Sequence, residues 1–320
     1  MFNRVLMVSA AAMFAATAAN AQTVGLGSTK SSMVAAMTTA ISNVVSGKTI
    51  LKMRRQVMGG TQKYIPVVNA GELEFAVSNM VQYAMAVDGR QLSKRKYDNL
   101  RLVATLMRFR TGLLVKNDSG IKTVADLKGK RFAYGFKGAP LFDAFARVML
   151  GTAGINYDKE IKRVPAVGLA QHWNLFKQGK VDGVIAGVGG GPNKDMNAKI
   201  SSGVRYLSFP TDTADAKKWI ATIPGGVFEE VKAAKPYVAV KTPSVVLIGY
   251  DFMLFTNKNV PEKTVAEVAK AMVAGVKDFH AVSPVWRTYN EKRAQKDQGA
   301  RYPYHAGAIK AYKELGLWSR

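Results

Sequence analysis

The sequence predicts an α/β protein in which parallel strands end in short polar or glycine-rich loops that open helices. Three observations support this fold class. Short apolar runs alternate with amphipathic helical patterns along the chain. Three successive predicted strands, at residues 23–27, 50–57 and 75–78, each end in such a loop. The mature chain, roughly 300 residues, has room for one large domain or two medium ones.

The first 21 residues have the pattern of a signal peptide. Residues 1–4 are a short basic start, residues 5–19 are apolar and rich in alanine, and Ala19-Asn20-Ala21 matches an A-x-A cleavage site. The apolar run is too short to be a good membrane anchor, and no other stretch of the sequence could span a bilayer. We therefore expect cleavage after Ala21 and a mature, soluble protein in the periplasm.

The composition narrows the classes of function. The sequence has no cysteine, which excludes disulfides, Cys-ligated zinc and thiol catalysis. It has 46 Lys and Arg against 22 Asp and Glu, a formal net charge of +24, and such a field attracts anions, anionic polymers or nucleic acid. The basic residues are spread along the chain and no nucleic-acid recognition motif is found. A solvated basic surface is therefore favoured, and no nucleic-acid partner is expected.

The remaining elements are expected from apolar periodicity and turn residues. Further strands are expected at residues 100–106, 112–115, 131–134, 184–186, 204–209 and 244–256. Helices are expected at residues 64–69, 121–127, 169–176, 262–279 and 302–318, and two more begin at Met33 and Leu141. Residues 211–242 are poorly periodic, so they are expected to form surface loops. The strand at 244–256 is long enough to cross between two domains.

A strand, a glycine loop and a helix start lie together at residues 131–150. The apolar run 131–134 is followed by the Gly/Pro-rich loop 135–140, and a helical pattern begins at Leu141. Such a unit directs free backbone N–H groups and the positive end of a helix dipole at one point. An anion, or the carboxylate of a small metabolite, is the natural occupant. An ordinary turn between a strand and a helix uses the same residues and is the alternative.

Several segments, in order along the chain, resemble a known family. They are GELEFAV at 71–77, SGIKTVADLKGKR at 119–131, GKVDG at 179–183, HAGA at 305–308 and GLW at 316–318. Each segment alone is a weak signal, but all of them in order behind a signal peptide are a strong one. The chain resembles the TAXI family of solute receptors of TRAP transporters, which are type-II periplasmic solute-binding proteins.

The resemblance implies a fold of two α/β lobes with a ligand held in the cleft between them. Residues 22–110 and 250–320 would form lobe I, and residues 111–249 would form lobe II. It also implies a receptor that captures a small organic anion, a carboxylate or an amino acid, and delivers it to TRAP membrane permease subunits driven by an ion gradient. Such a receptor performs no chemistry and needs no cofactor, and we expect it to be a monomer.

Candidate ligand-binding residues lie in loops and segments next to predicted strands. They are Ser28, Thr29, Ser31, Gly60, Thr61, Asn79, Arg110, Gly138, Ala139, Gly190 and Gly191. The hydroxyls near a helix N-terminus could hold a carboxylate, although a cluster that only caps a helix uses the same residue types. The glycine loops could form backbone nests around an anion, or they could be ordinary turns.

Arg108 and Arg110 are expected on one face of an extended segment, because side chains alternate along a strand. Arg110 is preferred as the counter-charge for a carboxylate, and a solvated basic face is the alternative. Phe109, Phe136 and Tyr83 either line an apolar part of the pocket or belong to the core.

Two other classes of function stay open on this fold. A periplasmic sensor that feeds a sensor kinase would differ only in its partner. A periplasmic enzyme is disfavoured, because the sequence has no G-x-S-x-G or H-E-x-x-H motif and no nucleophile–base pair at recognisable spacing. No cluster of side chains has metal-ligand spacing.

Overall fold

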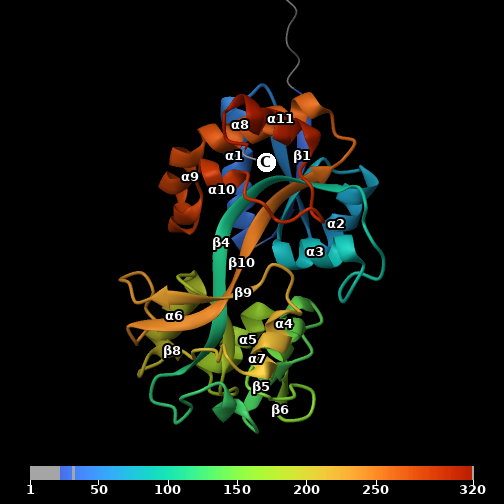
Figure 1. Ribbon diagram of the computed structural model, residues 1–320. Coiled ribbons are helices and arrows are strands. Elements are labelled where there is room, and N and C mark those ends of the chain that lie inside the picture. The colour runs from blue at the N-terminus through green and yellow to red at the C-terminus, as the bar shows by residue number, and fades with distance from the viewer. Residues whose placement is uncertain (1–21, 31–32, 319–320) are drawn as a thin grey trace, which may run out of the picture.

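Two long antiparallel strands, β4 (Leu100–Lys116) and β10 (Ser244–Asn257), run through the molecule and join two α/β lobes (Figure 1). The computed structural model describes residues 22–30 and 33–318. Leu100 lies opposite Asn257 in one lobe, and Thr111 lies opposite Ile248 near the other. Because each strand belongs to both lobes, the two strands form the hinge of the fold.

The lobe that holds Gln22 and Trp318, the upper lobe in Figure 1, is built on a sheet in the order β2-β1-β3-β10-β4. Its other strands are β1 (Thr23–Thr29), β2 (Lys52–Met58) and β3 (Phe75–Asn79). β1 is parallel to both β2 and β3, and β3 is antiparallel to β10. Its helical elements are α1 (Met33–Lys48), α2 (Thr61–Ala70), α3 (Met80–Asp88), α8 (Glu262–Ala274), α9 (Val276–Val282), η2 (Pro284–Thr288), α10 (Glu291–Ala294) and α11 (Ala306–Glu314).

The lower lobe is built around the far ends of the hinge strands. Its own strands are β5 (Arg131–Tyr134), β6 (Lys162–Pro165), β7 (Val184–Gly187), β8 (Val204–Tyr206) and β9 (Val227–Lys232). β5 and β6 are parallel, β7 and β8 pair with β4, and β9 pairs with β10. Its helical elements are η1 (Ala125–Leu127), α4 (Leu141–Gly151), α5 (Leu169–Lys177), α6 (Gly191–Lys199) and α7 (Ala214–Ile220).

Local sequence explains how these helices begin and end. α3 begins at Asn79, whose Oδ1 accepts a hydrogen bond from the Gln82 amide at 2.8 Å. It ends at Gly89, which has a φ of 65° and therefore closes the helix in the left-handed conformation that favours glycine. His305 caps the start of α11: its Nδ1 accepts from the Gly307 amide at 3.1 Å. The sequence also predicted the start of α4 at Leu141.

The prediction that residues 211–242 form only surface loops is wrong. α7 begins there at Thr213, whose hydroxyl accepts from the Ala216 amide at 3.0 Å. β9 forms because β10 offers it a free edge, with Glu229 opposite Leu247 and Val231 opposite Val245. The apolar pattern of this segment is weak because much of β9 is exposed.

Five other expectations differ from the structure in their boundaries. The helix expected at 262–279 is divided at Gly275. The strands expected at 100–106 and 112–115 are one continuous strand. The expected helix 121–127 is reduced to the short turn η1, and the strand expected at 204–209 ends at Tyr206. The final helix begins at Ala306 because His305 caps it.

The pairing of β10 changes partner along its length. Residues 252–256 pair with β3, and residues 244–249 pair with β9. A division of the chain near residues 110 and 250 stays a prediction.

The predicted signal peptide, residues 1–21, lies outside the described residues. Within the described part of the chain, no helix combines the length and apolar character needed to cross a membrane.

Candidate functional site

The ends of three parallel strands bring one group of predicted residues to the same edge of the sheet. β1 and β2 are in register up to Thr29 and Met58, and Gly27 of β1 lies opposite Ala76 of β3. Ser28 at this edge is fully buried, and its Oγ lies 2.7 Å from the Thr38 hydroxyl. Ser31 lies outside the described residues.

The other predicted residues of the upper lobe lie at the starts of α2 and α3. The Tyr64 hydroxyl lies 3.2 Å from Thr61 Oγ1 and 2.5 Å from the Val77 carbonyl, so it ties the start of α2 to β3. Gly60 precedes α2, which no side chain caps. Asn79 caps α3, and its Nδ2 donates to Gln82 Oε1 at 2.9 Å.

A second group of predicted residues lies at strand ends in the lower lobe. The Gly138 amide donates to the Val167 carbonyl at 2.8 Å, so the loops that follow β5 and β6 lie side by side. A Cβ at Gly138 would lie 2.9 Å from that carbonyl oxygen, which explains the glycine. Ala139 is half-buried beside it. Gly190 and Gly191 open α6 after β7, again without a side-chain cap.

The strand ends of the two lobes meet at Phe109. Asn79, the last residue of β3, lies opposite Phe252 of β10, whose ring centroid is 5.7 Å from that of Phe109. Gly187, the last residue of β7, is so close to Phe109 that an added Cβ would lie 2.1 Å from its ring. The Val188 amide donates to the Arg110 carbonyl at 2.9 Å. Asn79 of the upper lobe and the end of β7 in the lower lobe therefore border the same part of the hinge.

The opposite face of the hinge strands carries an ionic cluster. Glu229 of β9 accepts from Arg108 Nε at 2.7 Å and from Arg110 Nε at 2.5 Å, so the two arginines do lie on one face. The acid Asp251 of β10 accepts from Arg108 at 3.3 Å, from Lys296 at 2.8 Å and also from Arg293. The role of Arg110 as a counter-charge for a ligand stays a prediction, because in this structure its guanidinium is paired with Glu229.

Charges in this cluster control the ionisation of both acids. Burial alone would raise the pKa of Asp251, but Arg293, Lys296 and Arg108 outweigh it and hold this pKa below its usual value. Burial likewise opposes the ionisation of Glu229, and the hydrogen bonds from Arg108 and Arg110 lower its pKa. Four basic side chains surround two acidic ones, so the cluster keeps an excess of positive charge.

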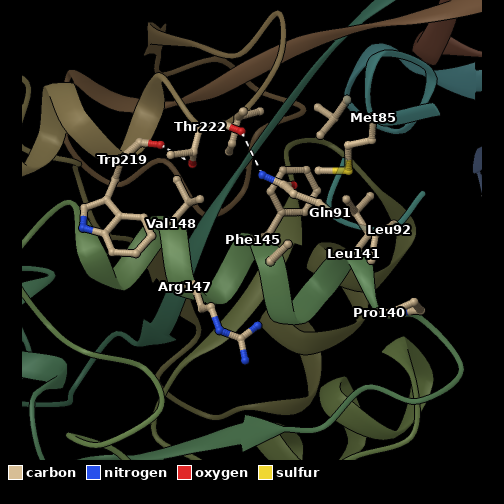
Figure 2. A pocket seen from close by; sticks show the side chains of 13 residues that line it. Met85, Gln91, Leu92, Pro140, Leu141, Phe145, Arg147, Val148, Trp219 and Thr222 are labelled. Carbon is tan, nitrogen blue, oxygen red and sulfur yellow. Dashed lines mark hydrogen bonds between the residues drawn. The ribbon is translucent and has the colours of Figure 1, made fainter. Parts of the chain in front are cut away.

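A cavity of about 380 Å³ lies between the lobes, with walls from α3 and α4 (Figure 2). It is lined by Val81, Met85, Gln91, Leu92, Pro140, Leu141, Ala144, Phe145, Arg147, Val148, Trp219, Thr222 and Ile223. Gln91 Nε2 donates to the Thr222 carbonyl at 3.4 Å across the cavity, which links the two lobes. A second cavity, about 550 Å³, lies beside it within the upper lobe and shares Met85 and Leu92 with the first.

Sequence reasoning missed several of these residues. Gln91, Trp219 and Thr222 carry no motif, and the last two fall in the segment predicted to be loops. Arg55, whose guanidinium reaches Ser28 Oγ at 3.2 Å, was hidden among many basic residues. The sequence could indicate only those residues that stand beside a Gly or Asn turn marker at the end of a predicted strand.

Two of the proposed pocket aromatics belong to the core instead. Tyr83 and Phe136 are fully buried, whereas Phe109 is half-buried at the hinge. His172 packs against Phe136, and burial lowers its pKa to about 3, so it is neutral. Among the described residues, no group of three or more His, Asp or Glu side chains is arranged to hold a metal ion.

Solute-binding proteins are among the solved structures with a similar fold. PhnD1 from Prochlorococcus marinus, solved with methylphosphonate, aligns with a TM-score of 0.56 over 93% of this chain and 99% of its own, at 12% identity. The periplasmic sulfonate-binding protein SsuA from Methylobacillus flagellatus aligns with a TM-score of 0.53 over 94% and 96%, at 14% identity. A TctC solute-binding protein from Polaromonas aligns with a TM-score of 0.51 over 83% and 86%, at 13% identity.

These similarities and the hinge define the class of fold, which is that of the two-lobed periplasmic solute-binding proteins. The expected fold class is confirmed. The chain belongs to the NMT1-like family, whose model matches residues 22–316.

Proposed function

We propose that this protein is a periplasmic receptor that captures a small organic anion, a carboxylate or an amino acid, between its two lobes. It performs no chemistry on the ligand. The predicted signal peptide supports export, and the fold supports closure of two lobes around a solute.

The observation that carries this proposal is the meeting of strand ends from both lobes at Phe109. Asn79 of β3 pairs with Phe252, which packs against Phe109, and Gly187 of β7 lies against Phe109 from the other lobe. A solute held there would contact both lobes at once, and it would therefore stabilise their closed arrangement.

Helix starts in both lobes favour a negatively charged solute. α2, α4, α5 and α6 all begin after strands, and none of them has a side chain that caps its first turn. First-turn amides of a helix without a side-chain cap can bind an anion or water, and the helix dipole favours negative charge. The net charge of +24 raises the local concentration of anions further.

The resemblance to TAXI-family receptors supports delivery to TRAP permease subunits, which an ion gradient drives. The other candidate is an ABC permease, because the similar SsuA from Methylobacillus flagellatus is named as part of a sulfonate ABC transporter. Uptake by vesicles that contain the cognate permease distinguishes the two. TRAP delivery requires uptake to persist without ATP and to stop when the ion gradient is collapsed.

A negative charge introduced at a helix start tests the anion site. Gly191 is exposed, and an added Cβ there meets nothing within 4 Å, so Gly191→Asp places a carboxylate at the start of α6 without a clash. Gly120→Asp is the matched control, because its Cβ is also unobstructed and Gly120 lies in the turn before η1. Native mass spectrometry of gently purified protein, followed by calorimetry with carboxylates, amino acids, sulfonates and phosphonates, identifies the anion.

We expect Gly191→Asp to weaken binding at least tenfold. Two unit charges about 4 Å apart interact by about 4 kcal/mol near a protein surface, and about 1.4 kcal/mol corresponds to tenfold. Gly120→Asp should bind as the wild type does. The absence of any anion that binds, or equal affinity in Gly191→Asp and wild type, would contradict the proposal.

A further inference from the structure

We infer that the cavity between α3 and α4 holds an apolar part of the captured anion, an aryl ring or a short branched alkyl group. This inference rests on the proposed function and deepens it, because it names the class of substrate as carboxylates with an apolar substituent. Acetate-like anions without such a substituent would bind more weakly.

The cavity lies directly beside the predicted anion-binding residues in both lobes. Val81, in its upper wall, is two residues past Asn79 at the start of α3. Pro140, in its lower wall, directly follows Ala139. A carboxylate held at the strand ends would therefore have its substituent next to this cavity.

The chemistry of the lining suits an uncharged, apolar group. Ten of the thirteen lining side chains are apolar, and the exceptions are Gln91, Arg147 and Thr222. Figure 2 shows the Arg147 guanidinium turned away from the apolar side chains. It is paired with Asp158 at 2.8 and 2.9 Å, so Arg147 offers the cavity its aliphatic stem and not a free charge.

The size of the cavity fits a ring with a short linker. Its volume of about 380 Å³ lies at the lower end of the range for small-molecule sites, which is roughly 300–1,000 Å³. An apolar cavity of roughly 150 Å³ in another protein binds benzene. Transfer of an apolar ring from water into such a site is favourable in proportion to the area that is removed from water.

Occupation of the cavity would also link the lobes. One wall comes from α3 and the loop at Gln91 and Leu92, and the other from α4 and the residues around Trp219. Gln91 has a φ of 53°, and among the described residues it is the only one other than glycine with a positive φ. Its side chain spans the lobes to Thr222. A strained residue that joins two lobes at a cavity is a feature typical of ligand clamps.

Filling the cavity tests the inference. In Ala144→Trp, an indole ring occupies the space of the ligand's substituent. Ala281→Trp makes the same change on the exposed side of α9 and is the control. Leu92→Trp, in a loop, fills the cavity from the other lobe and covers the case in which Ala144→Trp does not fold. Calorimetry with acetate, benzoate, phenylacetate and the neutral benzyl alcohol gives the affinities, and circular dichroism checks the fold.

We expect the wild type and Ala281→Trp to bind benzoate or phenylacetate at least tenfold more tightly than acetate. In Ala144→Trp and Leu92→Trp, the ratio of the affinity for the aromatic carboxylate to that for acetate should fall below about threefold, with little change in the affinity for acetate. The inference is overturned if the wild type binds acetate and this ratio is less than threefold, or if both cavity variants keep the wild-type ratio.

The proposed function fails in a different way. If no carboxylate binds but benzyl alcohol does, and Ala144→Trp abolishes its binding, then the apolar cavity is supported and the anion receptor is contradicted. Binding of none of the four probes overturns this inference, and the proposed function is overturned with it only if no amino acid, sulfonate or phosphonate binds either.

Discussion

Asp251 gives the sharpest test of how the hinge is held together. Its side chain is only 2% exposed and lies on β10, where it accepts from Arg108, Arg293, Lys296 and Gln298. In Asp251→Asn the shape is kept and the negative charge is lost. The three basic side chains then face an amide, and part of their charge is buried without a partner.

The size of the effect follows from this burial. Removal of one partner from a buried ion pair costs about 3–5 kcal/mol, because the other charge stays buried and unpaired. Asp278 on α9 is the control, since its side chain is 51% exposed and it pairs with Lys48 at 2.9 Å. A surface pair of this kind contributes about 0–1 kcal/mol, so Asp278→Asn should be nearly neutral.

Urea unfolding followed by circular dichroism measures both variants, with the same m-value required for a valid comparison. We expect Asp251→Asn to lose about 3–5 kcal/mol of unfolding free energy relative to wild type. A loss below 1 kcal/mol, or one no larger than that of Asp278→Asn, would show that Lys296 and Arg293 are satisfied by water and would refute the reasoning.

Two further predictions concern pH and packing. The pKa values of Asp251 and Glu229 are lowered in the folded state, so their contribution is present above their unfolded values of roughly 4 and is lost as pH falls through the folded-state values. The loss of unfolding free energy in Asp251→Asn relative to wild type should therefore become smaller as the pH is lowered from 6 to strongly acidic values. Urea unfolding at each pH measures this loss, and a loss that does not change with pH would contradict the prediction. Gly187→Ala should cost about 1–3 kcal/mol, because its Cβ would lie 2.1 Å from the Phe109 ring. An added Cβ at Gly47 in α1 meets nothing within 4 Å, so Gly47→Ala should raise the unfolding free energy by up to about 1 kcal/mol. Equal melting temperatures for the two variants would contradict the packing argument.

The local elements were largely readable from the sequence. β5 was predicted at residues 131–134 and is found there, and α5 and β10 were predicted within one residue at each end. A final helix was predicted within residues 302–318, and α11 lies there with His305 as its cap. These features depend on side chains a few residues apart, so turn chemistry and apolar periodicity suffice to place them.

The candidate site was only partly readable. Asn79 and the glycines of the loops were found because they mark turns. The structure places Asn79 opposite Phe252, which packs on Phe109, and it places Gly187, which was not among the predicted residues, against Phe109. Their role in binding stays a proposal. The cavity between the lobes was not predicted, because Val81, Ala144 and Trp219 come from three segments with ordinary apolar residues.

By itself, the sequence determined the α/β class and most of the order of strands, loops and helices, because these are specified by neighbouring residues; the export signal stays a prediction. Only the tertiary structure decided that β9 exists, since an exposed strand forms only where β10 provides an edge. It likewise decided that Arg108 pairs with Glu229, which is 121 residues away along the chain. Such pairings depend on which side chains meet in space, and no local pattern specifies that.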